Sequence, residues 1–441
     1  MLFSLSQRAY RRIYILVAVL ALLHFYAFYS HYSPSNAAPV YSVNGLIPAD
    51  CPSLPGLENV VLVLKTGVTE AHDKLPIHRN TTLRCIPNYI VWSDFDESVA
   101  DIPVHDVLFN ESAHLHSKPD FNLYTRVQTH GRNALTQHDL SDDPSTPFGK
   151  TNPGWKLDKW KFVPMIQHTF ALFADRPNLD WFVFMEADTY IVWSSLLAWL
   201  QKLDARKPYY LGNQMQIADV LFAHGGSGFV LSRPAISRAA DLVAAQRDHW
   251  YWVTEREWAG DCVLGILLRD AGVNLHWSWP MLQIAPPKEV DHFSANYGHN
   301  AWCYPAVTFH HLRPNEIAEI EAAEKSLARR GGRAGPREPL LWRDVYYELG
   351  RPKMRQGPVM DWDSEAGEEK AVVRSVETCR ILCEGDTSCL QYVRRADGMC
   401  LFGRVARVGE AREGFASGWM LDRIDAVAQG LGSCARPEWI L

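Results

Sequence analysis

Hydrophobic residues gather in short runs along this chain, and polar or turn-forming residues separate the runs. Three of them, at 59–67, 88–97 and 180–193, are rich in Val, Ile, Phe and Trp, and each has the length of a strand. The segment 155–174 lies between the last two and carries apolar residues on one helical face, despite Pro164. Strands that alternate with helices predict a mostly parallel sheet with helices on both faces.

The same alternation continues toward the C-terminus. Residues 225–245 read as a glycine turn, a strand and a helix that begins at Ser-Arg-Pro. Residues 260–273 predict an amphipathic helix that opens on an acid. Asn315 to Pro339 is a polar helical segment followed by a Gly/Arg/Pro stretch, which indicates a domain boundary.

The N-terminus carries the longest apolar run, residues 13–29. Arg8, Arg11 and Arg12 precede it, and no Lys or Arg follows before Lys65. This asymmetry predicts a single-pass type II signal anchor with the rest of the chain lumenal. A cleaved signal peptide is the alternative, but the run ends in aromatic residues rather than a small-x-small site.

Composition narrows the class of protein. A length of 441 residues predicts two or three domains, and a formal charge of −6 argues against a nucleic-acid partner. Nine cysteines and two N-glycosylation sequons, at Asn80 and Asn110, fit an oxidising lumen. Four cysteines cluster between 379 and 400 and predict a disulfide framework. A zinc site is the weaker reading, because no C-x2-C pair is present.

Glu186 and Asp188 follow an apolar strand and are the first candidates for chemistry. Ligands bind beyond the carboxyl ends of strands in open α/β sheets, and two converging carboxylates suit a hard divalent cation that also grips a diphosphate. The structural alternative is an Asp that caps the next helix beside a solvated Glu. His310 and His311 follow a later β-like run and supply a third ligand or a structural pair. If strand alternation persists, only one of them faces the site.

An acid-x-acid pair is typical of enzymes that transfer a sugar from a nucleoside diphosphate, where the metal neutralises charge on the departing diphosphate. Such a transferase also needs a base that takes the proton of the acceptor hydroxyl. Asp261 stands at a predicted helix start, where a catalytic base and a helix N-cap are both open. Lys159 and Lys161 precede the acid motif and are either phosphate contacts or surface charges.

Four motifs, DWFVFMEADTYIVW, GGSGFVLS, GDCVLG and FHHL, occur in the order found in glycosyltransferase family 31. Over roughly residues 58–315 the chain resembles Fringe-like and core 1 β1,3-galactosyltransferase-like members of the fungal type. The resemblance implies a GT-A fold, which is a Rossmann-like α/β architecture. It also implies a UDP-sugar donor, Mn2+ as the cofactor and inversion at the anomeric carbon.

The resemblance assigns roles residue by residue. Asp188 matches the last acid of the metal-binding motif, and His310 matches the C-terminal metal ligand of the family. Asp261 matches the catalytic base. Thr66 and Asp94 fall where the first two strands approach the uridine.

Other positions complete or depart from the family pattern. Gly225 and Gly226 match a turn beside the transferred sugar, where the backbone approaches too closely for a Cβ. Glu186 stands where Asp is frequent, so it either joins the metal or meets the ribose or a metal-bound water. Gly260 replaces a frequent second acid beside the base. Lys159 is retained as a donor-phosphate contact.

The cysteine-rich segment resembles a PAN/apple module, a small disulfide-rich α+β unit. That likeness pairs Cys383 with Cys389 and Cys379 with Cys400, and the module is either a carbohydrate or protein binder or a stabilising appendage. Fringe-like chains suggest a bridge between Cys262 and Cys303, and Cys51 with Cys85 is a further pairing. Cys434 is then left over for an intermolecular bond that would link two copies of the chain.

The predicted organisation is a cytosolic tail (1–12), transmembrane anchor (13–29), stem (30–57), GT-A domain (58–315), helix and linker (316–357), PAN-like module (358–425) and C-terminal tail (426–441). The predicted function is a metal-dependent inverting glycosyltransferase of the Golgi membrane, which moves a hexose from a UDP-sugar to a glycan or glycoprotein. Two alternatives are a catalytically silent GT-A relative that binds lumenal partners through the module, and a metal-dependent hydrolase.

Overall fold

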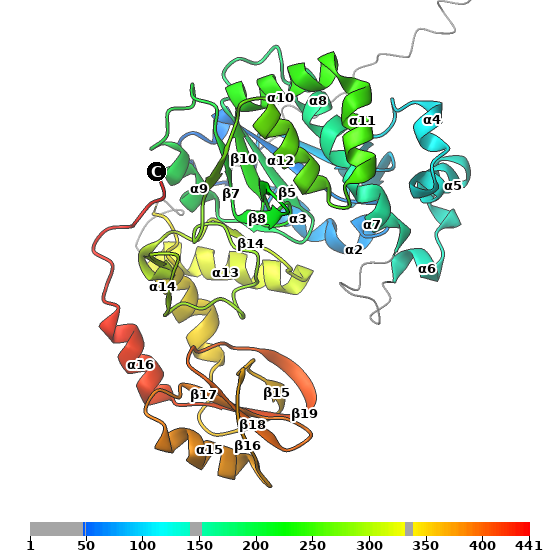
Figure 1. The fold of residues 1–441 in the computed structure, drawn as a ribbon. Coiled ribbons are helices and arrows are strands. Elements are labelled where there is room, and N and C mark those ends of the chain that lie inside the picture. The colour runs from blue at the N-terminus through cyan, green and yellow to red at the C-terminus, as the bar shows by residue number, and fades with distance from the viewer. Residues whose placement is uncertain (1–46, 49, 142–151, 331–337) are drawn as a thin grey trace, which may run out of the picture. The chain divides into compact units, whose positions relative to one another are not determined.

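An eight-stranded mixed sheet forms the centre of the structure, a computed structural model that describes residues 47–48, 50–141, 152–330 and 338–441 (Figure 1). Its strands, in spatial order, are β11 (Leu275–Trp277), β7 (Tyr210–Gly212), β10 (Phe229–Ser232), β5 (Trp181–Glu186), β1 (Val60–Lys65), β2 (Tyr89–Ser93), β4 (Ile102–Asp106) and β3 (Glu97–Val99). The predicted strands of the first three runs are therefore the adjacent strands β5, β1 and β2.

The sheet is mostly parallel, with one informative exception. β1 is parallel to β2 and to β5, whereas β10 runs antiparallel between β5 and β7. A parallel connection needs a crossover, usually a helix, and none intervenes between β7 and β10. The chain instead forms a hairpin, β8 (Gln214–Ile217) with β9 (Val220–Ala223), and re-enters the sheet in the opposite direction.

Helices cover both faces of this sheet (Figure 1). Val60, Leu62 and Leu64 of β1 share a core with residues of α9 and α13, while α8 and α10 pack together and α10 contacts β5. All six residues of β1 are buried, as expected for a strand covered on both sides. The helices up to the end of α13 are α2 (Ala71–Lys74), α3 (Pro76–Asn80), α4 (Ala113–His116), α5 (Asn122–His130), α6 (Gln137–Leu140), α7 (Pro153–Asp158), α8 (Phe162–Leu172), α9 (Trp193–Leu200), α10 (Arg233–Ala245), α11 (Arg247–Arg256), α12 (Gly260–Asp270) and α13 (Pro314–Arg330).

Four short strands form two small antiparallel pairs outside the central sheet. β6 (Tyr190–Ile191) pairs antiparallel with β14 (Thr308–Phe309), and β12 (Ala295–Asn296) forms a hairpin with β13 (His299–Asn300). The pairing of β6 with β14 joins segments that are more than one hundred residues apart.

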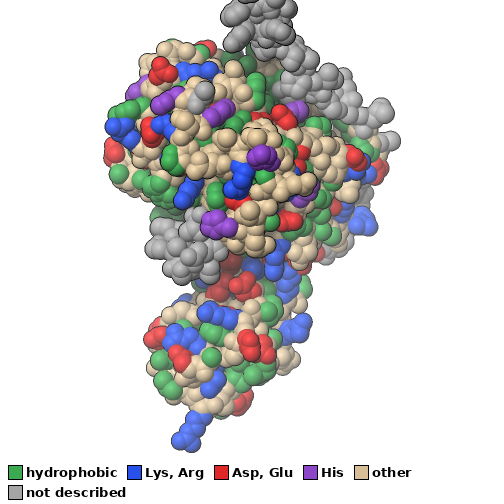
Figure 2. Space-filling model, turned by 90° about the vertical axis from the view of Figure 1, so that its right-hand side faces the viewer, with side chains coloured by type: hydrophobic (Ala, Val, Ile, Leu, Met, Phe, Trp, Pro, Cys, Tyr) green, Lys and Arg blue, Asp and Glu red, His purple; other side chains and the backbone are tan. Residues whose placement is uncertain are grey.

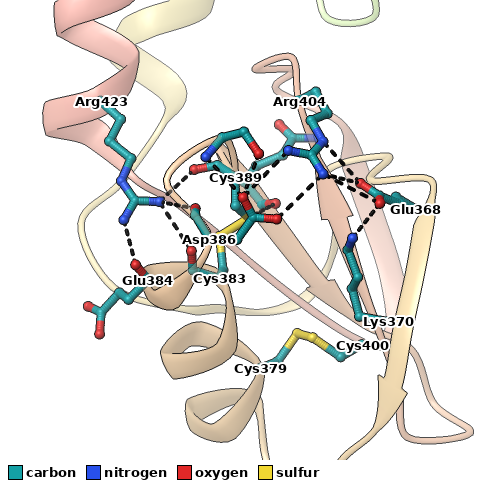
Figure 3. Close-up of a disulfide and its surroundings, with 12 residues drawn as sticks. Glu368, Lys370, Cys379, Cys383, Glu384, Asp386, Cys389, Cys400, Arg404 and Arg423 are labelled. Carbon is teal, nitrogen blue, oxygen red and sulfur yellow. Dashed lines mark hydrogen bonds and ion pairs between the residues drawn. A yellow bond between two sulfur atoms is a disulfide. The ribbon is translucent and has the colours of Figure 1, made fainter.

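A second sheet contains the cysteine-rich segment. It is antiparallel, in the order β15 (Val359–Asp363), β19 (Glu410–Trp419), β17 (Gln391–Arg394), β18 (Met399–Gly403) and β16 (Glu368–Val372). The remaining helices are α14 (Trp342–Val345), α15 (Val376–Gly385) and α16 (Leu421–Gly430). Arg423 of α16 donates hydrogen bonds to the carbonyls of Cys383, Glu384, Asp386 and Cys389, and so satisfies groups at the end of α15 (Figure 3).

Four disulfides are present among the described residues. Cys51–Cys85, Cys379–Cys400 and Cys383–Cys389 confirm the predicted pairings. In the second of these, the bond joins α15 to β18 (Figure 3).

The predicted bridge between Cys262 and Cys303 is wrong. Cys303 pairs with Cys434, which removes the residue expected to link two copies of the chain. Cys262 is a buried thiol that packs with Phe222 of β9 on the inner side of α12. Cys303 lies instead beside the C-terminal tail, because the neighbouring Trp302 Nε1 donates to the carbonyl of Gly432.

No helix in the described ranges is long and apolar enough to cross a membrane. The predicted anchor at 13–29 lies outside the described residues. On the face shown in Figure 2, acidic and basic side chains are interspersed, in keeping with the modest formal charge of −6.

Candidate functional site

The candidate site lies at the carboxyl edge of the parallel strands, where β5 ends on Glu186. Ala187 and Asp188 form a turn between β5 and β6. His78 Nε2 donates to the carbonyl of Ala187 at 2.8 Å, and the backbone N–H of Leu312 donates to the carbonyl of Asp188 at 3.0 Å. Hydrogen bonds from α3 and from the segment after β14 therefore fix the position of the turn that carries Asp188.

The pairing of β14 with β6 carries the histidine pair to this turn. His310 Nε2 lies 3.2 Å from Asp188 Oδ1, and the side chains of Asp188, His310 and His311 bring three ligand atoms within 4.8 Å of one another. Strand β14 ends at Phe309, and His311 has φ 57°, so the extended alternation stops before the pair. The condition under which only one of the two histidines would face the site is therefore not met, and both lie beside Asp188.

These three side chains, called the metal-ligand cluster below, fit a divalent transition metal such as Mn2+. A carboxylate with imidazoles is a donor set that such ions accept. His310 Nδ1 is buried and has no hydrogen-bond partner among the described residues. A Cβ on Gly226 would lie 2.1 Å from His310 Nε2, so only glycine leaves room for this ring.

Lys74 supplies positive charge to the cluster. Its Nζ lies 3.0 Å from Asp188 Oδ2 and 2.8 Å from Glu70 Oε2. Burial opposes ionisation of Asp188, but the hydrogen bond with His310 and the charge of Lys74 together hold its pKa well below the ordinary value. A bound cation and Lys74 would therefore compete for the same carboxylate.

Glu186 forms an ion pair with a lysine of the neighbouring strand. Lys65 and Glu186 are register neighbours on β1 and β5, and Lys65 Nζ lies 3.1 Å from Glu186 Oε1 and 2.6 Å from Asp158 Oδ2. Burial raises the pKa of Glu186, but the Lys65 charge outweighs it and lowers that pKa to about 2. Glu186 is not part of the metal-ligand cluster, and its direct role as a ligand stays a prediction.

Asp261 lies in the first turn of α12 and points its carboxylate at the glycine turn. Oδ2 accepts the backbone N–H of Gly225 at 3.0 Å, and Oδ1 accepts that of Cys262 at 2.9 Å. Ala259, not Asp261, occupies the N-cap position. Burial raises the pKa of Asp261 to about 6, and the negative charge of Glu186 adds to this effect. A carboxylate with a pKa near neutrality is suited to act as a general base.

The glycine turn lies between the acids. A Cβ on Gly225 would be 3.1 Å from Glu186 Oε1 and 3.6 Å from the Cβ of Asp261. The departure at Gly260 also has a steric reason, because a Cβ there would lie 2.3 Å from the Phe162 ring.

Thr66 and Asp94 lie at the ends of β1 and β2, as predicted from the resemblance. The carbonyl of Thr66 accepts a hydrogen bond from Lys161 Nζ at 2.8 Å, and Lys161 Nζ lies 3.4 Å from Asp94 Oδ1. Asp94 Oδ1 also accepts the N–H of Val68 at 2.8 Å. Asp94 Oδ2 is buried and has no hydrogen-bond partner among the described residues, which leaves an acceptor for a ligand donor.

Lys159 lies elsewhere. Its Nζ donates to the carbonyls of Glu255 and Glu257 and pairs with Asp120 at 3.2 Å, so it ties the end of α7 to the connection between α11 and α12. Lys161, not Lys159, is the lysine beside Thr66 and Asp94.

The structure adds Lys65, Lys74 and Asp158 to the site, which the motifs did not predict. The sequence could have indicated Lys65, because Lys65 follows the apolar run VVLVL just as Glu186 follows the apolar run WFVFM. Lys74 and Asp158 are ordinary polar residues of short helices, and only their contacts identify them.

The mixed sheet, the acid turn at its carboxyl edge and the facing histidines fit a GT-A type fold. Comparison with known proteins agrees with this class. Residues 128–301 match the family model described as Fringe-like. The matched region contains Asp188, both site glycines and Asp261, and it ends before the histidine pair.

One curated relative is similar over a shorter stretch. Chondroitin sulfate synthase 3 of Mus musculus is 27% identical over 151 residues, which make up 32% of this chain and 16% of that protein. The chain thus matches about a sixth of that relative's length. Together the two matches support a resemblance to glycosyltransferases.

Proposed function

We propose that this protein is a metal-dependent inverting glycosyltransferase that moves a hexose of the galactose or N-acetylglucosamine type from a UDP-sugar to a glycan or glycoprotein hydroxyl, in a β1,3 linkage. The observation that carries the proposal is the convergence of the metal-ligand cluster and Asp261 around one glycine turn. The Fringe-like match over residues 128–301 supports the same class of reaction.

The donor would lie along the carboxyl edge of the sheet. Thr66 and the unpartnered Asp94 Oδ2 would contact the uridine, and Lys65 and Lys74 would face the diphosphate side. Gly225 and Gly226 would lie under the transferred sugar, where the absence of a Cβ allows close approach. Asp188, His310 and His311 would hold Mn2+, which when bound neutralises negative charge on the diphosphate.

Asp261 would act on the acceptor. Its carboxylate takes the proton of the acceptor hydroxyl while the hydroxyl oxygen forms a bond to the anomeric carbon. The bond from that carbon to the β-phosphate oxygen breaks, and its electron pair leaves with UDP. Attack from the side opposite the leaving group inverts the anomeric configuration.

The proposal includes a place in the cell. We take the 13–29 run to be a type II anchor that leaves the site in the Golgi lumen. Four disulfides among the described residues and the exposed Asn80 and Asn110 of the two sequons support an oxidising lumenal environment.

The test is a screen of UDP-sugars against the purified lumenal part for release of UDP, with and without Mn2+. Asp188→Ala is expected to abolish Mn2+-dependent release, and Asp261→Ala to abolish transfer while UDP still binds in Mn2+. Full turnover in both variants would show that the site is assigned wrongly. If the wild-type protein fails to bind UDP in Mn2+, the silent GT-A relative becomes the better description.

A further inference from the structure

The hairpin of β12 and β13 displays a large aromatic side chain in an unfavourable backbone conformation. Tyr297 is 75% exposed and has φ 52°, and Gly298 beside it has φ 82°. A two-residue turn with both values positive favours Asn-Gly or Gly-Gly, and a bulky aromatic residue is rare in the left-handed region. The fold therefore holds Tyr297 at a strained tip instead of burying it.

Two indole rings flank this tyrosine. The ring centroid of Trp277 lies 4.8 Å from that of Tyr297 at an interplanar angle of 70°, and the Trp279 centroid lies 5.7 Å away at 79°. Both tryptophans are only partly buried. The three rings are called the aromatic corner below, and both indole rings lie edge to face with the Tyr297 ring.

A series of contacts connects the aromatic corner with the metal-ligand cluster. Trp277 Nε1 donates to Asn213 Oδ1 at 3.2 Å, and the carbonyl of Asn213 accepts the N–H of His224 at 2.8 Å. The His224 ring lies 5.2 Å from that of His310. The corner is thus separated from the cluster by two contacting residues.

The sheet topology places the corner on the side of β5 opposite Thr66 and Asp94. β11 is parallel to β7, and β10 is antiparallel to both β7 and β5, so β11 and β5 end at the same edge. Thr66 and Asp94 lie at the ends of β1 and β2 on one side of β5, whereas Trp277 ends β11 on the other side, beyond β7 and β10.

We infer that Trp277, Trp279 and Tyr297 bind the acceptor sugar, stacking on the apolar C–H face of its pyranose ring. This inference rests on the proposed function, because it identifies the second substrate of the same site. A pyranose offers one face of C–H groups and a rim of hydroxyls, and exposed aromatic rings match the apolar face while the rim stays in water. An acceptor on the β11 side approaches the glycine turn from opposite the uridine, as in-line attack requires.

The experiment measures binding and transfer separately. Saturation-transfer NMR with a panel of methyl glycosides of galactose, N-acetylgalactosamine, glucose, N-acetylglucosamine, mannose and fucose is run on the wild-type lumenal protein and on Tyr297→Ala and Trp279→Ala. The wild type is expected to saturate the ring C–H protons of at least one glycoside, and Tyr297→Ala to weaken that binding about tenfold. Tyr297→Phe keeps the ring and is expected to keep binding.

Trp252→Ala is the matched control, because Trp252 is 51% exposed on α11 and stacks under Arg256 instead of in the corner. Mn2+-dependent UDP binding and the melting temperature are measured for every variant. Loss of glycoside binding in Tyr297→Ala with UDP binding intact supports the inference. Equal glycoside binding by wild type and Tyr297→Ala, or no binding of the panel by the wild type, overturns it. Failure of the wild type to bind UDP would instead contradict the proposed function.

Discussion

The close approach of Gly226 to His310 gives the sharpest test of the metal-ligand cluster. The perturbation is Gly226→Ala, which adds one methyl group. Its Cβ would lie 2.1 Å from His310 Nε2, 2.2 Å from Cε1 and 2.8 Å from Cδ2. Real Cβ contacts are essentially never shorter than 3.0 Å, so the ring or the turn must retreat by about 1 Å.

A displacement of this size is large for a ligand atom. Metal–ligand distances tolerate changes of about 0.2 Å, and a misplacement of about 1 Å in an active site costs on the order of 100-fold in rate. We therefore expect Gly226→Ala to reduce Mn2+-dependent UDP release by about 100-fold and to weaken Mn2+ binding in step.

The assay has two controls. In Gly225→Ala the nearest contacts are 3.1 Å to Glu186 Oε1 and 3.3 Å to Phe162, which small shifts relieve, so we expect a loss of less than about tenfold. Gly385→Ala, far along the chain in α15, meets nothing within 4 Å and is expected to be silent. Mn2+ affinity is followed by titration and folding by thermal melting. Wild-type affinity and turnover in a folded Gly226→Ala protein would refute the role of His310 as a ligand.

Further predictions concern Asp261, Lys74 and the Cys303–Cys434 disulfide. Burial first, and a neighbouring carboxylate second, raise the pKa of Asp261 to about 6, so transfer should fall about tenfold per pH unit below that value in a pH–rate profile. The pKa of Asp261 is higher in the folded protein than in the unfolded chain, so protonation of Asp261 stabilises the fold. This contribution is complete below pH 3.8 and is lost as the pH rises through about 6. In urea titrations, the free energy of unfolding of Asp261→Asn should therefore equal that of the wild type at pH 4 and exceed it at pH 7.5 by at most about 3 kcal/mol. A difference between the two proteins that does not change with pH would contradict this. Lys74→Gln should bind Mn2+ severalfold more tightly without nucleotide, because the ammonium 3.0 Å from Asp188 no longer competes; unchanged affinity in a Mn2+ titration would argue against that competition. Replacing both Cys303 and Cys434 by Ser opens a loop of 131 residues and should lower the free energy of unfolding by up to about 5 kcal/mol. Because this bond lies within one chain, the wild type should run as a monomer on a non-reducing gel.

The local elements could be predicted because local patterns specify them. The runs that became β1, β2 and β5, the Ser-Arg-Pro start of α10 and the acidic start of α12 carry their own strand and helix signals. Two of the four disulfides were predicted through the resemblance to a PAN/apple module, whereas the correct pairing of Cys51 with Cys85 had no local pattern behind it.

Contacts between distant segments could not be predicted from local patterns. The Cys303–Cys434 bond depends on the C-terminal tail lying against Trp302, and no local spacing encodes that contact. Both histidines reach the metal-ligand cluster because β14 ends at Phe309 and the backbone of His311 is no longer extended. The reversed direction of β10 depends on the β8–β9 hairpin, which replaces a crossover helix.

By itself, the sequence determined which residues end the buried strands and therefore which edge of the sheet carries charge. Apolar runs that stop on Lys65, Ser93 and Glu186 place polar groups at one edge, because parallel strands share the direction of their carboxyl ends. Only the tertiary structure decided which of these charges meet. Lys65 neutralises Glu186 through strand register, whereas Asp188 meets the histidine pair through a two-residue strand pairing more than one hundred residues away. The interaction energy between two charges falls as the distance between them grows, and differences of a few ångströms in that distance are set by tertiary packing.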